Sequence, residues 1–296
     1  MSIFQKLCDV YDSLIDTTAT EGENPLTPIG FTREEIAFNI ILSPEAEFVS
    51  VSSLPEKEKY TVPSTPLAEA RSGSLPDPYP LADKLKYFIT IGEPSNPLYE
   101  KYIKQLREWC EQTHAPECLH VLLRYLEKKT LYADLKSNPS IKVNVALDEN
   151  TKKLDGSDVD KIVCFSIEYP DDENRLWMRQ DVRESWEKHF TVKFYGTPGL
   201  CYVTGQTLGI MEKHPGVSGT SRLISSKDDA FPFRYKGRFV ENGSAATVSS
   251  LASFKAHKAL DWLLKHQGFQ RYGMSFVGWN TQAPALYPEE EEKPLP

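Results

Sequence analysis

The run from Lys161 to Tyr169 (KIVCFSIEY) constrains the fold more than any other stretch of the chain. Its apolar residues are nearly continuous, whereas a strand with one face in water alternates apolar and polar residues. We therefore expect a strand that is buried inside a sheet.

Five further stretches have the composition of strands: Glu35 to Ser43, Glu47 to Leu54, Ile141 to Leu147, Leu200 to Gly205 and, last in the chain, Met274 to Trp279. Only Ser-Pro-Glu-Ala separates the first two, so we expect them to form an antiparallel hairpin. The sequence LCYVTG predicts a strand that ends in a glycine turn.

Five stretches repeat apolar residues at steps of three and four, as amphipathic helices do. They are Ile3 to Ile15, Leu98 to Gln112, Pro116 to Lys129, Asp181 to Phe190 and Thr247 to Gln267, the last headed by Ser244 and ending at Gly268. The predicted fold class is α+β: a mixed, mostly antiparallel sheet packed by the helices that start at Leu98, Pro116 and Thr247.

The length of 296 residues suffices for one large domain or two ordinary ones. We expect one α+β domain over residues 1–285. Residues 286–296 contain four consecutive Glu and three Pro, which is typical of a linker or a frayed tail. The chain stops abruptly after this segment, and we expect that further sequence followed it.

Charge is unevenly distributed along the chain. The net charge is −8, but the segment from Lys188 to Arg238 holds eight Lys or Arg against three acidic residues. A basic segment in an acidic protein favours one surface that faces a polyanion. An ordinary solvated loop with scattered lysines is the alternative that charge alone leaves open.

Several classes of protein lack their signature here. The five cysteines are scattered, with no C-x-x-C pair and no His at zinc-ligand spacing, so they read as small core residues in a reducing cytosol. The sequence contains no Walker A, G-x-G-x-x-G or H-E-x-x-H motif, and its serines at Ser218 and Ser225 do not match a serine hydrolase. No run is long enough to span a membrane, and the N-terminus does not resemble a signal peptide. We expect a cytoplasmic protein without a cofactor or a metal site.

Two loops contain candidate ligand-binding residues. In Arg71 to Pro80 (RSGSLPDPYP), Gly73 permits close backbone approach, and Arg71, Ser72 and Ser74 offer donors that suit phosphate. A surface connector is the alternative interpretation of this loop. In the other loop, His214 precedes Pro215 and Gly216, so we expect a structural or phosphate-contacting residue in a turn rather than a catalytic one.

Six segments, in order, carry a resemblance to a known family. They are GFTREEIAFNIIL at 30–42, Arg71-Ser-Gly followed by Asp83 and Tyr87, CYVTGQ at 201–206, HPGVSG at 214–219, LISSKDDAF at 223–231 and ALDWLL at 259–264. Together they resemble the large subunit of the type I-C CRISPR Cascade complex. The resemblance spans nearly the whole chain, which would be the N-terminal part of that subunit.

The resemblance implies a non-enzymatic subunit that recognises the protospacer-adjacent motif on double-stranded DNA and helps to separate the strands. Its partners would be the target DNA, a guide RNA and the other Cascade subunits, with base pairing reading the rest of the target. The nucleic-acid-binding candidates are Arg71, Ser72, Gly73 and Ser74 for the motif, and Lys213, His214, Arg222, Lys227, Arg234, Lys236 and Asn242 for strand separation and phosphate contact.

Two other functions stay open at this point. A metal-dependent nuclease would need carboxylates brought together from distant positions, which a sequence cannot exclude. The acidic run Asp171 to Asn174 is expected to be a solvated turn, not such a site. A protein-protein scaffold without DNA contact is the third function.

Overall fold

A computed structural model describes residues 2–18, 26–69, 74–92, 95–138, 141–148, 154–170, 173–211, 214–217, 223–224 and 247–279. The chain divides into two compact units. One unit is continuous and comprises Gly30–Lys193, and the other combines Met1–Ile29 with Phe194–Pro296. The prediction of one domain over residues 1–285 stays a prediction, and the expected tail at 286–296 lies outside the described residues.

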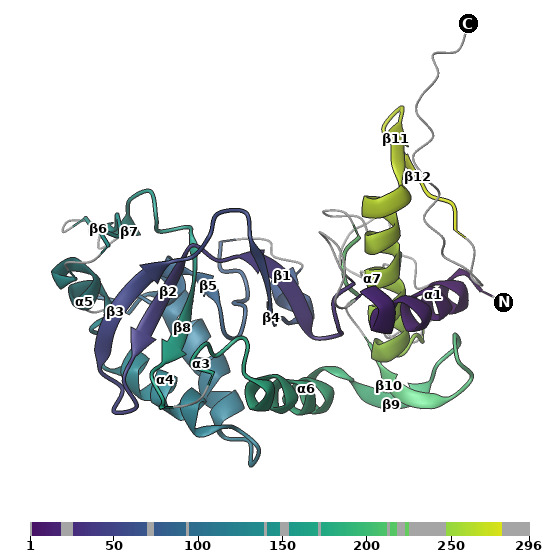
Figure 1. Cartoon of the computed structure of the whole chain (residues 1–296). Coiled ribbons are helices and arrows are strands. Elements are labelled where there is room, and N and C mark those ends of the chain that lie inside the picture. The colour runs from purple at the N-terminus through teal and green to yellow at the C-terminus, as the bar shows by residue number, and fades with distance from the viewer. Residues whose placement is uncertain are drawn as a thin grey trace, which may run out of the picture. The chain divides into compact units, whose positions relative to one another are not determined.

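The unit Gly30–Lys193 is built around a four-stranded mixed sheet in the order β3-β2-β8-β5 (Figure 1). Its strands are β2 (Phe38–Leu42), β3 (Phe48–Ser53), β5 (Asp83–Lys84) and β8 (Ile162–Ile167). Strand β8 runs parallel to β2, and the β2–β3 and β5–β8 pairs are antiparallel. The expected hairpin, the α+β class and the mixed sheet are therefore confirmed.

Two smaller strand pairs and the helices complete the elements of this unit. They are β1 (Phe31–Glu35), β4 (Lys59–Pro63), α2 (Pro66–Glu69), η1 (Leu85–Tyr87), α3 (Pro97–Cys110), α4 (Glu117–Glu127), α5 (Leu131–Ser137), β6 (Ala146–Leu147), β7 (Leu154–Asp155) and α6 (Gln180–Phe194). Strand β1 pairs with β4, and β6 pairs with β7, both antiparallel.

Strand β8 is buried from Val163 to Ile167, as its continuous apolar run predicts. The ring of Phe165 packs edge-on against Phe88 with a centroid separation of 5.1 Å, and Phe88 packs against Tyr102 of α3 at 4.5 Å. Aromatic contacts therefore connect the central strand to the first of the two long helices that the sequence predicts.

Helices α3 and α4 confirm the predicted helical pair. The Asn96 side chain caps α3 by accepting a hydrogen bond from the Leu98 amide at 3.0 Å, and Pro97 occupies the first turn, where a missing N–H costs nothing. At the other end of α3, the Trp109 indole donates to Ser185 of α6 at 3.0 Å. The Trp109 and Trp186 rings lie 4.9 Å apart, so α6 is fixed against α3.

Strand β4 was not predicted, and one prediction in this unit is wrong. Lys59–Pro63 forms β4 although it ends in a proline. Pro63 ends that strand, where its missing N–H interrupts no ladder. Of the predicted strand Ile141 to Leu147, only Ala146–Leu147 is a strand. Val143 and Val145 are buried as their alternation suggests, but the Asn144 amide donates to the Asp158 carboxylate at 2.7 Å instead of to a neighbouring strand.

The second unit contains α1 (Ile3–Thr18), the hairpin of β9 (Thr197–Leu200) and β10 (Thr207–Ile210), α7 (Ser250–Gln267), and the hairpin of β11 (Phe269–Arg271) and β12 (Met274–Phe276) (Figure 1). Helices α1 and α7 pack together over buried apolar residues that include Leu7, Val10, Ala259 and Leu263. The predicted helices at both ends of the chain are therefore confirmed, and they form one core.

The predicted strand Leu200 to Gly205 is wrong beyond its first residue, because Leu200 ends β9 and residues 201–206 form the turn of the β9–β10 hairpin. The Gly205 amide donates to the Cys201 carbonyl at 2.8 Å, and Gly205 has a φ of +71°. The helix start at Ser244 is also wrong. Ser249 caps α7, and its hydroxyl accepts from the Ala252 amide at 3.2 Å.

Candidate nucleic-acid interface

The predicted motif-reading loop is only partly described. Arg71, Ser72 and Gly73 lie outside the described residues, whereas Ser74 is exposed at the start of a described segment that continues to Gly92. The structure thus describes the chain that leaves the loop.

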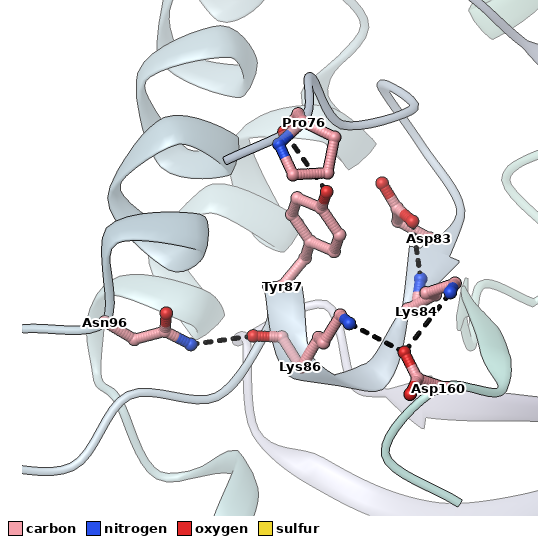
Figure 2. Close-up of polar contacts among 7 residues, drawn as sticks. All are labelled: Pro76, Asp83, Lys84, Lys86, Tyr87, Asn96 and Asp160. Atoms are coloured by element: carbon pink, nitrogen blue, oxygen red, sulfur yellow. Dashed lines mark hydrogen bonds and ion pairs between the residues drawn. The ribbon is translucent and has the colours of Figure 1, made fainter. Parts of the chain in front are cut away.

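Three side chains hold the backbone after the loop by its carbonyl groups. Lys101 donates to the Leu75 carbonyl at 3.1 Å, the Tyr87 hydroxyl to the Pro76 carbonyl at 3.1 Å, and the Tyr102 hydroxyl to the Pro80 carbonyl at 3.0 Å (Figure 2 shows the second). Proline has no backbone N–H, so carbonyls are the available backbone groups at two of these positions. The proline-rich sequence is therefore anchored to α3 and η1.

A buried carboxylate supplies the complementary anchor. Asp83, at the start of β5, is fully buried and accepts hydrogen bonds from the Tyr79 amide at 2.8 Å and the Lys84 amide at 2.6 Å. A buried charge is tolerated only when such donors compensate for the lost water. Asp83 and Tyr87 are the two positions that the resemblance associates with the loop beginning at Arg71-Ser-Gly. In the structure, both bind the backbone between Pro76 and Lys84.

Asn96 joins η1 to the start of α3. Its amide nitrogen donates to the Lys86 carbonyl at 2.8 Å (Figure 2) and to the Ile89 carbonyl at 2.9 Å, while its oxygen caps α3. The sequence contains Asn-Pro at this position, a helix-start signal that the sequence analysis did not use. One side chain therefore connects the support of the loop to the helical pair.

Two lysines beside these anchors share one carboxylate. Lys84 and Lys86 reach the same Asp160 oxygen at 3.2 and 2.7 Å (Figure 2). The hydrogen bond from Lys86 is the largest cause that lowers the pKa of Asp160 below its usual value. All three side chains are partly exposed, and together they carry a charge of about +1. No sequence pattern indicates this cluster, because Asp160 lies far from the lysines in the chain.

Of the second set of candidates, only His214 is described. Lys213, Arg222, Lys227, Arg234, Lys236 and Asn242 lie outside the described residues. His214 is buried, and its Nδ1 lies 2.8 Å from the Ser253 hydroxyl of α7. Its ring stacks on His257, with 6.2 Å between centroids and 15° between planes. These contacts attach the His-Pro turn to α7, and a contact of His214 with phosphate stays a prediction.

A metal-dependent nuclease would need carboxylates that converge in space. Within those residues no group of three His, Cys, Asp or Glu is arranged to hold a metal ion. In the acidic run at 171–174, Glu173 is paired with Arg175, whose guanidinium donates to both carboxylate oxygens at 2.9 Å and lowers the Glu173 pKa to about 2. Glu173 is thus neutralised by an arginine.

None of the helices described here is long and apolar enough to cross a membrane.

Comparison with known proteins adds the class and then the family. A family model of CRISPR-associated proteins matches residues 7–294. This match covers nearly the whole chain, so the chain is a CRISPR-associated protein and belongs to the Cas_Csd1 family. No curated protein matches the chain.

Proposed function

We propose that this chain is a non-catalytic subunit of a type I-C Cascade, acts in the cytoplasm, recognises the protospacer-adjacent motif on duplex DNA and assists strand separation. The family match makes it CRISPR-associated. The single observation that supports motif reading is the anchoring of the segment after Arg71–Ser74 by Asp83, Tyr87, Lys101 and Tyr102. A loop on a rigid support loses little conformational entropy when it binds.

In this proposal the two kinds of DNA contact are divided between neighbouring groups. Arg71, Ser72, Gly73 and Ser74 read base edges, because base contacts specify sequence. Lys84 and Lys86 provide cations beside the loop for phosphates, which position the duplex without reading it. The basic segment of the other unit, with Lys213, Arg222 and Lys227, contacts the backbone of the opened strands.

The test is binding of a guide-loaded complex, reconstituted with and without the chain, to target duplexes that differ only in the motif. The chain should restore motif-dependent binding. Replacing Arg71 and Ser72 together with Ala should weaken binding to the correct motif by about tenfold or more while changing nonspecific binding little, since one good base contact is worth about 1–3 kcal/mol. Arg124→Ala, at an exposed position of α4, is the matched control.

Neutralising Lys213, Arg222 and Lys227 should act differently. Loss of phosphate contacts lowers affinity for all duplexes alike and flattens the dependence of affinity on salt. Equal losses on target and scrambled duplex for the Arg71 and Ser72 double variant would contradict the assignment of motif reading. Cleavage of the target upon addition of Mg²⁺ or Mn²⁺ would instead favour a nuclease, and salt-independent association with the complex alone would favour a scaffold.

A further inference from the structure

The hairpin that follows α7 has an unusual turn. Strands β11 and β12 are joined by Tyr272 and Gly273, whose φ angles are +52° and +73° (Figure 1). A two-residue turn with both φ angles positive is the type I′ geometry, which favours Asn-Gly. Glycine adopts this conformation freely, whereas a bulky side chain is disfavoured there by its Cβ.

Tyr272 gains no burial in exchange for this conformation, because its side chain is 83% exposed. A residue held in a disfavoured backbone conformation without packing suggests that its side chain serves a function. The Arg271 guanidinium lies 5.2 Å from the centre of the Tyr272 ring, and no described carboxylate forms an ion pair with Arg271. The tip of the hairpin thus presents an aromatic ring beside a cation.

One face of the hairpin continues this surface. The register places Phe269 opposite Phe276 and Arg271 opposite Met274 on the same face, since every second residue of a strand points the same way. The two Phe rings stack with 5.2 Å between centroids and 14° between planes. Both rings and Met274 are exposed. The remaining pair on the opposite face is polar, so the hairpin has one exposed aromatic face.

Charge and area together indicate what such a face would bind. Residues 268–279 include one Arg and no Asp or Glu, so the hairpin favours an anionic partner. The four exposed side chains, Phe269, Tyr272, Met274 and Phe276, offer about 500 Å² in total, given the usual size of aromatic side chains. A stable interface with a second copy needs about 800 Å² on each partner. Planar rings beside an arginine suit stacking on nucleobases, which requires much less area.

We propose that the β11–β12 hairpin binds unpaired nucleobases, with Tyr272 stacking on a base and Arg271 contacting that base or its phosphate. This inference rests on the proposed function and deepens it, because it names single-stranded nucleic acid as the ligand of this element. The site is separate from Arg71–Ser74, which belongs to the other unit.

The experiment compares two labelled oligonucleotides of equal length and charge, oligo-dT and a strand of abasic sites, by fluorescence anisotropy with the full chain. Both carry phosphates, and only the first carries bases. Stacking on one base should make oligo-dT bind about tenfold tighter than the abasic strand. Tyr272→Asn should remove most of this ratio and leave abasic binding unchanged. Because Asn suits the turn, this variant should fold at least as well as the parent.

Two further variants complete the design. Tyr202→Asn replaces another exposed tyrosine of the same unit, in the β9–β10 turn, and should leave the ratio unchanged. Arg271→Ala should weaken binding of both strands if the cation contacts phosphate, and of oligo-dT alone if it contacts the base. Equal binding of both strands by the parent, binding of neither, or an unchanged ratio in Tyr272→Asn would each overturn the inference.

The outcome is separable from that of the proposed function. Suppose that the complex recognises its motif but the preference for oligo-dT is absent or does not depend on Tyr272. In that case only the assignment of nucleobase binding to the hairpin is wrong. If the chain fails to restore motif-dependent binding but Tyr272 supports the preference for oligo-dT, motif recognition is wrong and single-strand binding stands.

Discussion

Tyr87→Phe gives the sharpest test of whether the anchored segment supports the motif-reading loop. The change removes one hydroxyl and retains the buried ring, so core packing is preserved. The lost interaction is the 3.1 Å hydrogen bond to the Pro76 carbonyl. A hydrogen bond of this kind contributes about 1 kcal/mol net to stability.

The effect on binding follows from where this bond lies. Pro76 is two residues after Ser74, so the variant loosens the chain that leaves the loop. If binding must restore the lost order, about 1 kcal/mol corresponds to about fivefold weaker motif-dependent binding. Nonspecific binding, which depends on phosphate contacts, should change little.

Tyr99→Phe is the matched control. The Tyr99 hydroxyl donates to the Leu126 carbonyl at 2.8 Å, is buried like that of Tyr87, and joins α3 to α4 rather than to the loop. Both variants should lower the free energy of unfolding by about 1 kcal/mol in urea titrations. Only Tyr87→Phe should weaken binding to the motif duplex in the reconstituted complex. Equal losses of motif binding in the two variants would refute the role of the anchor.

Stability should depend on pH through His189, which is buried between tryptophans and whose pKa is lowered to about 4 by desolvation. Between this pKa and the unfolded pKa of about 6.5, the unfolded chain binds more protons than the folded one, so the free energy of unfolding should fall by about 2 kcal/mol from pH 7 to pH 5. His189→Phe should flatten this dependence on pH in urea titrations. If the dependence persists in the variant, His189 is not its source. A Cβ at Gly209 would lie 1.7 Å from the Tyr195 carbonyl oxygen, so Gly209→Ala should destabilise the protein by about 2 kcal/mol or more. Gly205→Ala, where a Cβ meets no atom within 4 Å but φ is +71°, should cost about 1 kcal/mol in thermal unfolding; equal costs at the two glycines would contradict the clash.

Local apolar patterns in the sequence were sufficient to predict the long helices and the buried strand. The apolar periodicity of Leu98 to Gln112 and of Ile3 to Ile15 predicts helices, and the unbroken run at Lys161 to Tyr169 predicts a buried strand, because each pattern reports which faces are buried. The same reasoning failed for Ile141 to Leu147 and Leu200 to Gly205. Their apolar side chains are buried as expected at Val143 and Val145, but their backbones bond to turns, which periodicity does not report.

For the candidate site, residue types alone indicate the loop chemistry of Arg71 to Ser74, and the resemblance indicates the family that the comparison confirms. The contacts of Asp83 and Tyr87 with the backbone of Tyr79 and Pro76 became visible only in the folded chain, because no residue type reveals a backbone partner. Folding also brings Asp160 to Lys84 across 76 residues of chain, with Lys86 on the same carboxylate, and it places Tyr272 at positive φ on a hairpin tip. Sequence patterns record which side chains seek burial or water, whereas long-range pairing and backbone conformation depend on how the whole chain packs.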